Sequence, residues 1–302
     1  MFMNTIQASK INTQGTIEQY NWPWENEQFQ VTYETLGQGN PVLLLPAFST
    51  VSSRTEMTGI AQLLAQHYQV YLLDWLGFGD SQRPAVDYNP QLYHQLLKDF
   101  VNATFQKPVI IIAAGHSVGY ALDLAKIAPE TVSKLILIAP TWRGPLRVMG
   151  VPKSIRNLLK NLVRTPIIGQ FLYYLNTTPS FLKLMYRRHV YVDSTKLTDE
   201  FITNKRNITQ QKGARFAPVA FVTGNLDPIE TREDVLSLIK SLSQPILTII
   251  AEQSPPYSKQ EMEAIREIDQ VKTVSLPGTL GIYEEFSELV TEKIKQFLGN
   301  SV

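Results

Sequence analysis

The sequence predicts an α/β fold in which a mostly parallel, doubly wound sheet carries helices on both faces, with a helical insertion. Three observations predict it. Short apolar runs typical of buried strands alternate with longer amphipathic segments typical of helices along most of the chain. This alternation breaks between residues 141 and 215 and then resumes, which indicates an inserted segment. The chain of 302 residues, 44% of them hydrophobic, can bury one large core.

The expected elements follow from local patterns taken in order along the chain. Apolar or alternating runs predict strands at 29–36 (an edge strand), 42–45, 69–74, 108–114, 134–140, 245–252 and 271–278. Apolar residues three or four apart predict helices at 56–67, 89–104, 120–128, 232–242, 259–268 and 284–298. We divide the chain into an N-terminal arm (1–15), a core (16–140 and 216–302) and an insertion (141–215).

The amino-acid composition excludes several kinds of functional site. The chain has no cysteine, so a disulfide, a thiolate nucleophile and a cysteine metal site are excluded, and we predict neither a metal nor a cofactor. The N-terminal residues lack an apolar run followed by a small-residue cleavage site, and nowhere do about 18 apolar residues follow one another. We therefore expect a cytoplasmic protein.

The net charge of +1 hides a strong asymmetry. Residues 141–220 hold fourteen Lys or Arg and three Asp or Glu, a net charge of +11, and the remainder of the chain carries −10. Such asymmetry predicts that the basic segment faces an anionic surface, so peripheral attachment to a membrane is one expectation. We expect no nucleic-acid partner, because the basic residues alternate with apolar stripes and no recognised module is present.

A possible nucleophile lies at residues 115–119, which read G-H-S-V-G and match the pattern G-x-S-x-G. They separate an expected strand from an expected helix, the context that places a nucleophilic serine above a sheet. We expect Ser117 to adopt a strained turn there, with small flanking residues that let strand and helix approach closely. The alternative is a serine that fills a tight turn without chemistry.

The order of the motifs resembles the α/β-hydrolase family over residues 16–298. The glycine turn before VLLL, the loop D-x-x-G-x-G-x-S at 74–81 and the G-x-S-x-G motif occur in the family's order. The resemblance implies an α/β-hydrolase fold with a cap at 141–215 and Ser117 as the nucleophile. The stretches LLLPAFSTVSSR, APTWRGPL and TGNLDP also resemble a sub-group of α/β-hydrolase-like proteins of photosynthetic organisms, from which no activity is carried over.

In this family two backbone N–H groups stabilise the oxyanion of the reaction intermediate. The resemblance places them on Val118, which follows the nucleophile, and on Phe48, in the loop after VLLL. The family usually has His-Gly before the second donor, where this chain has Pro46 and Ala47. Ala47 lacks the conformational freedom of glycine, so this departure puts the geometry of the loop in question.

The other two positions of the family's catalytic triad depart from the pattern. The family's order is serine, then acid, then a histidine near the C-terminus, but this chain has no histidine after His189. Ser254 occupies the place of the acid, and Leu280 occupies the place of the histidine. In a well-studied serine protease, loss of the triad histidine lowers turnover on the order of a million-fold. Surviving hydrolysis through Ser117 therefore needs a replacement base.

Four residues are candidate acids or bases in a non-standard arrangement. Glu252 and Asp227 are the nearest carboxylates, although a solvated strand end and a turn-forming Asp-Pro explain them equally well. His189, in the cap, would have to swing down over Ser117, and a solvated histidine is the simpler interpretation. Tyr283 is the polar residue nearest to the lost histidine. We expect three histidines to pack or to face away from the nucleophile: His67, His94 and His116.

The segment 153–164, KSIRNLLKNLVR, predicts an amphipathic cap helix. Its apolar face comprises Ile155, Leu158, Leu159, Leu162 and Val163. Its basic face comprises Lys153, Arg156, Lys160 and Arg164. Either the apolar face packs on the core and the basic residues are solvated, or the helix docks on anionic lipid. An apolar cap over the nucleophile implies a hydrophobic substrate or ligand in both cases.

Two functions remain open at this point. The first is a serine esterase that hydrolyses hydrophobic carboxylic esters through Ser117 with a non-standard base, with a membrane surface as one expected location. The second is a catalytically degenerate α/β-hydrolase that binds an apolar ligand, a protein partner or a membrane surface without turnover. The missing histidine favours the second, and the fold favours the first.

Overall fold

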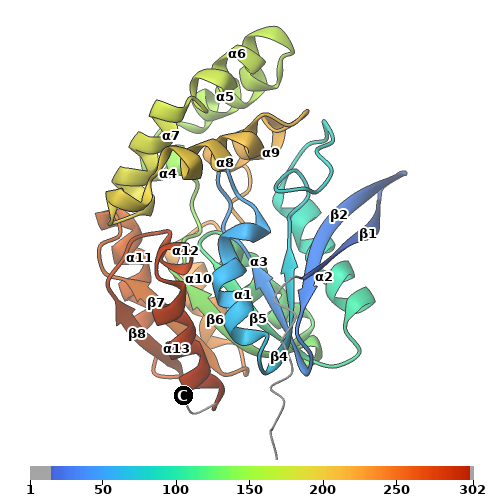
Figure 1. Ribbon diagram of the computed structural model, residues 1–302, viewed down its shortest axis with the longest axis vertical. Helices are drawn as coiled ribbons and strands as arrows, with labels where there is room; N and C mark the ends of the chain where they lie inside the picture. The colour runs from blue at the N-terminus through green and yellow to red at the C-terminus, as the bar shows by residue number, and fades with distance from the viewer. Residues whose placement is uncertain (1–14, 300–302) are drawn as a thin grey trace, which may run out of the picture.

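The computed structural model describes residues 15–299, and the predicted α/β fold is confirmed within them (Figure 1). One eight-stranded sheet has the order β1-β2-β4-β3-β5-β6-β7-β8. The pairs β1–β2 and β2–β4 are antiparallel, and the other pairs are parallel. The strands are β1 (Thr16–Trp24), β2 (Glu27–Leu36), β3 (Asn40–Leu45), β4 (Tyr68–Leu73), β5 (Val109–Ala114), β6 (Val132–Ile138), β7 (Ile246–Ala251) and β8 (Val271–Leu276). The predicted arm at 1–15 lies outside the described residues, apart from its last position.

Helices cover both faces of the sheet (Figure 1). Leu43 of β3 packs with residues of α2, α3 and α10, whereas its neighbour Leu44 packs with residues of α1 and α13. Successive side chains of a strand point to opposite faces, so a strand covered on both sides must be apolar throughout. The core helices are α1 (Thr58–Leu64), α2 (Pro90–Thr104), α3 (Ser117–Ile127), α10 (Arg232–Lys240), α11 (Pro256–Arg266), α12 (Ile282–Glu285) and α13 (Ser287–Leu298), with short 3-10 turns η1 (Arg54–Met57) and η2 (Pro129–Thr131).

The edge of the sheet differs from the expectation. The strand expected there, 29–36, is β2, and it lies one place inside the edge because β1 pairs along its outer side. The sequence pattern misses β1 because Pro23 interrupts it. An edge strand tolerates proline, since part of its backbone N–H row needs no partner strand.

A buried arginine holds two loops in place near the carboxyl ends of β3 and β4. Arg54 Nη1 lies 2.5 Å from Asp74 Oδ2 and 2.7 Å from Asp80 Oδ2, and Asp74 Oδ1 accepts the Arg54 backbone N–H at 2.6 Å. Asp74 is fully buried, so this charge must be paired. The ion pair fixes the loop after β3 relative to the loop after β4, and these loops supply the surroundings of Ser117.

The chain between β6 and α10 forms a helical layer beyond one end of the sheet, at the top of Figure 1. Its helices are α4 (Pro145–Val148), α5 (Lys153–Arg164), α6 (Ile167–Leu175), α7 (Pro179–Met185), α8 (Asp199–Thr209) and α9 (Phe216–Val222), with short turns η3 (Tyr186–Val190) and η4 (Ser194–Lys196). The division into core and cap at 141–215 stays our interpretation. Within residues 15–299 no helix combines the length and the apolar character needed to cross a bilayer.

Helix α5 turns its basic side toward neighbouring segments, unlike the cap helix of the first alternative above, whose basic residues are solvated. Its basic side chains bond to other segments: Arg156 to the Thr223 carbonyl at 2.5 Å, Lys160 to Asp87 at 3.3 Å and Arg164 to the Val86 carbonyl at 2.8 Å. Its apolar side is divided: Ile155 and Leu158 are exposed, whereas Leu159, Leu162 and Val163 are half-buried. No residue of the helix is fully buried, so the apolar face packs only in part, and loop carbonyls and a carboxylate beneath α5 hold its cationic side chains.

A buried lysine connects the helical layer to the core. Lys205 of α8 lies between Glu56 of η1 and Glu284 of α12, with Nζ–O distances of 3.2 and 2.7 Å. Tyr283 donates a hydrogen bond of 3.1 Å to Glu56. Burial raises the pKa of Glu56 to about 7, although Lys205 opposes this shift. Lys205 and Glu56 are buried and Glu284 is partly exposed, so loss of Lys205 would leave the two carboxylates unpaired between cap and core.

We expect Glu56→Gln to remove a pH-dependent part of the stability. The folded-state pKa of about 7 lies above the ordinary 4.5, so folding favours the protonated carboxyl. This contribution is fully present below pH 4.5 and is lost as the pH rises through 7. Urea titrations across this range should show the unfolding free energy of wild type, relative to Glu56→Gln, falling by on the order of 1–3 kcal/mol.

The matched control is Glu267→Gln, at an exposed position after α11. Its difference from wild type should stay constant with pH. A constant difference for Glu56→Gln as well, or one that grows with pH, would contradict the assigned shift.

Candidate active site

The strand-to-helix turn at residues 115–119 is relaxed at the serine. β5 ends at Ala114, Gly115 takes a positive φ of 51°, and α3 begins at Ser117. Among the described non-glycine residues only Glu25 and Ala139 have a positive φ. The expectation of a strained turn at Ser117 is therefore wrong, because Gly115 supplies the left-handed conformation and the serine joins the first turn of the helix.

The Ser117 hydroxyl is buried and occupied by hydrogen bonds. It donates to the backbone carbonyl of Pro46, and it accepts from Trp75 Nε1 at 3.1 Å. The same indole N–H also lies 3.1 Å from the Pro46 carbonyl oxygen. The solvent-exposed fraction of Ser117 is zero. The hydroxyl thus joins the loop after β3, the loop after β4 and the start of α3.

Aromatic side chains fill the space around this contact. The ring of Phe48 is buried and lies at the centre of the group. Its centroid lies 5.0 to 6.3 Å from those of six other rings: Trp75, Phe78, Tyr93, His116, Tyr120 and Phe221. Rings at these separations pack edge to face or tilted, as in an apolar core. Substrate could reach Ser117 only if some of these rings moved.

The two predicted oxyanion donors come from the segments that surround Ser117. Val118 donates its backbone N–H to the Gly115 carbonyl at 3.3 Å, within the turn itself. Phe48 follows β3 by three residues, in the loop whose Pro46 carbonyl accepts from Ser117. A carbonyl oxygen so close to the attacking oxygen presents negative charge where catalysis needs donors.

Ser254 and Leu280 occupy the family's acid and histidine positions, and both lie in packed parts of the structure. Ser254 is buried after β7, and its hydroxyl has no hydrogen-bond partner among the described residues. Leu280 packs against the apolar core beside β8. On either side of it, Thr279 donates its hydroxyl and Gly281 its N–H, at 3.0 Å for the latter, to the Val190 carbonyl of the cap.

The next residues of the same loop also hold the cap. The buried Glu285 carboxylate accepts backbone N–H groups from Val192 at 2.9 Å and Asp193 at 2.7 Å. Lys196 donates to the Glu285 carbonyl at 2.8 Å. The loop that carries a catalytic histidine in the family is, in this chain, an anchor for the cap.

Three of the four predicted acids or bases have partners or positions away from Ser117. Glu252 is exposed just after β7. Tyr283 donates to Glu56, as described above. His189 lies on η3 and is partly exposed, and burial together with Arg188 lowers its pKa.

Asp227, the fourth candidate, contacts His116, a residue that the sequence analysis expects to face away from the nucleophile. His116 Nε2 lies 3.3 Å from Asp227 Oδ1 and 3.0 Å from the Leu226 carbonyl oxygen. Asp227 also accepts the Gly144 N–H at 2.7 Å and Arg147 Nη1 at 3.0 Å. Both neighbours of Nε2 are acceptors, so Nε2 carries the proton and Nδ1 is the basic nitrogen.

The Nδ1 atom of His116 is buried and has no hydrogen-bond partner among the described residues. An imidazole oriented by a carboxylate through one nitrogen and basic at the other is the arrangement of a general base. No hydrogen bond joins this ring to Ser117 among the described residues, and the hydroxyl is directed to Pro46 instead. No sequence signal predicts the His116–Asp227 contact, because the two residues are far apart in the chain.

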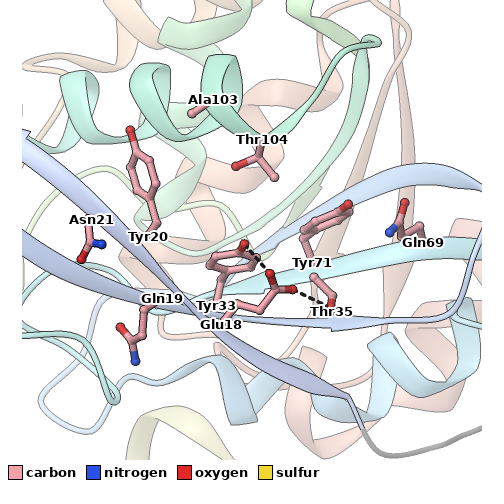
Figure 2. Close-up of a pocket in the computed structure, with 10 residues that line it drawn as sticks. All are labelled: Glu18, Gln19, Tyr20, Asn21, Tyr33, Thr35, Gln69, Tyr71, Ala103 and Thr104. Carbon is pink, nitrogen blue, oxygen red and sulfur yellow. Dashed lines mark hydrogen bonds between the residues drawn. The ribbon is translucent and has the colours of Figure 1, made fainter.

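A separate cavity of about 450 Å³ lies between β1, β2, β4 and the end of α2 (Figure 2). Tyr20, Tyr33 and Tyr71 line it together with Glu18. Both Glu18 carboxylate oxygens accept from hydroxyls of the cavity wall, Tyr33 at 2.9 Å and Thr35 at 3.0 Å (Figure 2). No residue of the 115–119 turn lines this cavity.

The fold and the 115–119 turn together define the class of protein. The chain belongs to the α/β hydrolase family, whose profile matches residues 42–279. The match ends one residue before Leu280, the position of the lost histidine.

Two curated relatives and one solved structure illustrate the similarity. The chain is 31% identical over 113 residues to a 2-hydroxy-6-oxo-6-(2'-aminophenyl)hexa-2,4-dienoic acid hydrolase of Metapseudomonas resinovorans, covering 36% of this chain and 38% of that one. It is 28% identical over 184 residues to a 2-hydroxy-6-oxononadienedioate/2-hydroxy-6-oxononatrienedioate hydrolase of Paraburkholderia xenovorans, covering 58% of each. A serine hydrolase involved in carbazole degradation, the CarC enzyme, superimposes with a TM-score of 0.70 at 18% identity, covering 95% of this chain and 100% of that one.

We expect Ser117→Ala to destabilise the protein by about 1–2 kcal/mol, because a buried hydroxyl with both a donor and an acceptor partner is lost. Ser254→Ala is the matched control, since its buried hydroxyl has no partner among the described residues; its effect should be close to zero or slightly stabilising. Urea-induced unfolding measures both. A Ser117→Ala variant more stable than wild type would instead indicate a strained nucleophile.

Proposed function

We propose that this chain is a non-hydrolytic member of the α/β hydrolase family, with a binding role and with Ser117 as a structural residue. The observation that carries the proposal is the hydrogen bond from the Ser117 hydroxyl to the Pro46 carbonyl. A nucleophilic serine needs a basic nitrogen or oxygen in that place, to which its proton can move during attack. A backbone carbonyl accepts a hydrogen bond but cannot take up the proton at neutral pH.

Three further features support the binding role. The serine is unstrained and fully buried, the surrounding space is filled by rings, and the loop of the lost histidine anchors the cap. Each would have to change for an ester to reach the hydroxyl. The resemblance to a sub-group with altered triad positions is in line with this proposal, and an apolar molecule, a protein or a membrane surface is the binding partner that the cap's composition favours. A cytoplasmic location with peripheral membrane attachment remains a prediction.

One observation favours a second function, a serine esterase of hydrophobic carboxylic esters. His116 and Asp227 form a buried imidazole–carboxylate pair next to Ser117 in the chain, with the basic nitrogen unpartnered among the described residues. In this alternative the hydroxyl leaves Pro46, His116 takes its proton, and Asp227 holds the imidazolium. The relatives are named as hydrolases of 2-hydroxy-6-oxo acids, which extends the candidate substrates to that class.

Hydrolysis assays separate the two functions. We expect wild type, Ser117→Ala and His116→Gln to hydrolyse p-nitrophenyl acetate, butyrate and octanoate, and a 2-hydroxy-6-oxo-hexa-2,4-dienoic acid, at the same background rate. Turnover that disappears in Ser117→Ala would overturn the proposal. If it also disappeared in His116→Gln and fell in Asp227→Asn, the base would be His116; if it survived in His116→Gln, another base would be acting.

A further inference from the structure

The outer face of the cap exposes a concentration of large apolar side chains. Among residues 15–299, twelve large apolar residues are strongly exposed, and ten of them lie between residues 149 and 192. The ten are Met149, Ile155, Leu158, Ile167, Ile168, Phe171, Tyr174, Leu175, Leu184 and Val192. Ile167 is 84% exposed and Phe171 is 60% exposed. Single exposed apolar residues are ordinary, but a cluster of this size on one face indicates an interaction surface.

The cluster lies on a well-supported part of the cap. Helices α5 and α6 form a hairpin at the end of the molecule farthest from the C-terminus (Figure 1). Gly169 is buried in their contact, and a Cβ at that position would lie 2.0 Å from the Val163 carbonyl oxygen. Arg156 and Arg164 of α5 bond to carbonyls beneath the helix, and Ile155 and Leu158 on its other side are exposed. We call Leu158, Ile167, Ile168 and Phe171 the cap tip.

The segment that carries the cap tip is basic: residues 141–192 contain nine Lys or Arg and no Asp or Glu. Carboxylates of other segments pair with some of these cations, as Asp87 does with Lys160 and Asp199 with Lys183. Several of these cations are occupied by internal bonds, but Lys153, Arg187 and Arg188 of the same segment are exposed. A second copy of this chain is a poor occupant, because two such faces would bring like charges together. An anionic partner is the complementary one.

The shape and chemistry of the cap tip favour a lipid bilayer among anionic partners. Its side chains are strongly exposed and mostly aliphatic, whereas protein-binding sites usually offer a packed central pocket with a polar rim. An amphipathic helix with aliphatic and aromatic residues on one side and cations nearby lies in the plane of a bilayer interface. Tyr174 is 46% exposed beside the tip, where its ring suits the headgroup level.

We propose that the cap tip inserts into the surface of an anionic lipid bilayer, and that the exposed cations Lys153, Arg187 and Arg188 attract the cap toward the anionic headgroups. This names the partner for the proposed binding role and rests on it. The insertion uses no atom of the Ser117 site, so the two proposals can fail separately.

Vesicle flotation with the full-length protein tests the insertion. The vesicles contain phosphatidylcholine alone or an equal mixture with phosphatidylglycerol. We expect wild type to float with the mixed vesicles and the double variant Ile167→Ser with Phe171→Ser to lose at least about tenfold in partition coefficient. In the double variant Arg187→Gln with Arg188→Gln, the partition coefficient should fall about tenfold or more on mixed vesicles only. Added salt should lower the partition coefficient of wild type on mixed vesicles in the same way.

The matched control is Ile17→Ser with Ile127→Ser, which removes two apolar residues of similar exposure, 59% and 53%, from the core. It should float as wild type does. Absence of flotation, or equal partition of the tip variant and wild type, would overturn the proposal. A dimer in sedimentation velocity that dissociates in the tip variant, without flotation, would assign the face to a second copy instead. Ser117→Ala should float as wild type does, because the insertion does not use the Ser117 site. If wild type both floated and hydrolysed esters, only the proposed non-hydrolytic role would be overturned.

Discussion

The hydrogen bond from the Ser117 hydroxyl to the Pro46 carbonyl is the contact on which the rest of this structure depends. It joins the loops after β3 and β4 to the start of α3, with the Trp75 indole completing the set. In a serine hydrolase the same hydroxyl must be held by a base and left free toward substrate. Here the geometry of the turn has relaxed, since Gly115 supplies the left-handed residue and Ser117 lies in regular helix. The scaffold of the family is retained, and its central serine stabilises the loops.

The departure of the loop after β8 from the family's pattern and the anchoring of the cap are connected. The loop that would carry the histidine has Leu280 in its place, and the flanking residues Thr279, Gly281 and Glu285 bond to backbone groups of the cap. Lys205 adds a buried charge between two carboxylates at the same junction. These directional bonds oppose opening of the cap, because opening would expose or unpair each of them. The outer face of the cap carries the exposed apolar residues.

The sequence predicted the fold well because its signals are local. Buried parallel strands are short apolar runs, and the 115–119 motif marks a strand-to-helix turn, so a mostly parallel sheet with helices on both faces could be predicted without coordinates. Strand β1 was not predicted, because Pro23 interrupts the alternating apolar pattern. An edge strand tolerates a proline at this position. Periodicity identified both faces of α5 but could not show which one meets the core, since that depends on carbonyls from distant loops. The contact between His116 and Asp227 was missed for the same reason.

The central claim is that Ser117 does not act as a nucleophile, and intact-protein mass spectrometry after exposure to an alkyl fluorophosphonate tests it most directly. The reagent reacts with a serine only when a base can take its proton, whatever the natural substrate. Our account predicts an unchanged mass for the folded protein. A single adduct on Ser117, absent from Ser117→Ala, would contradict it.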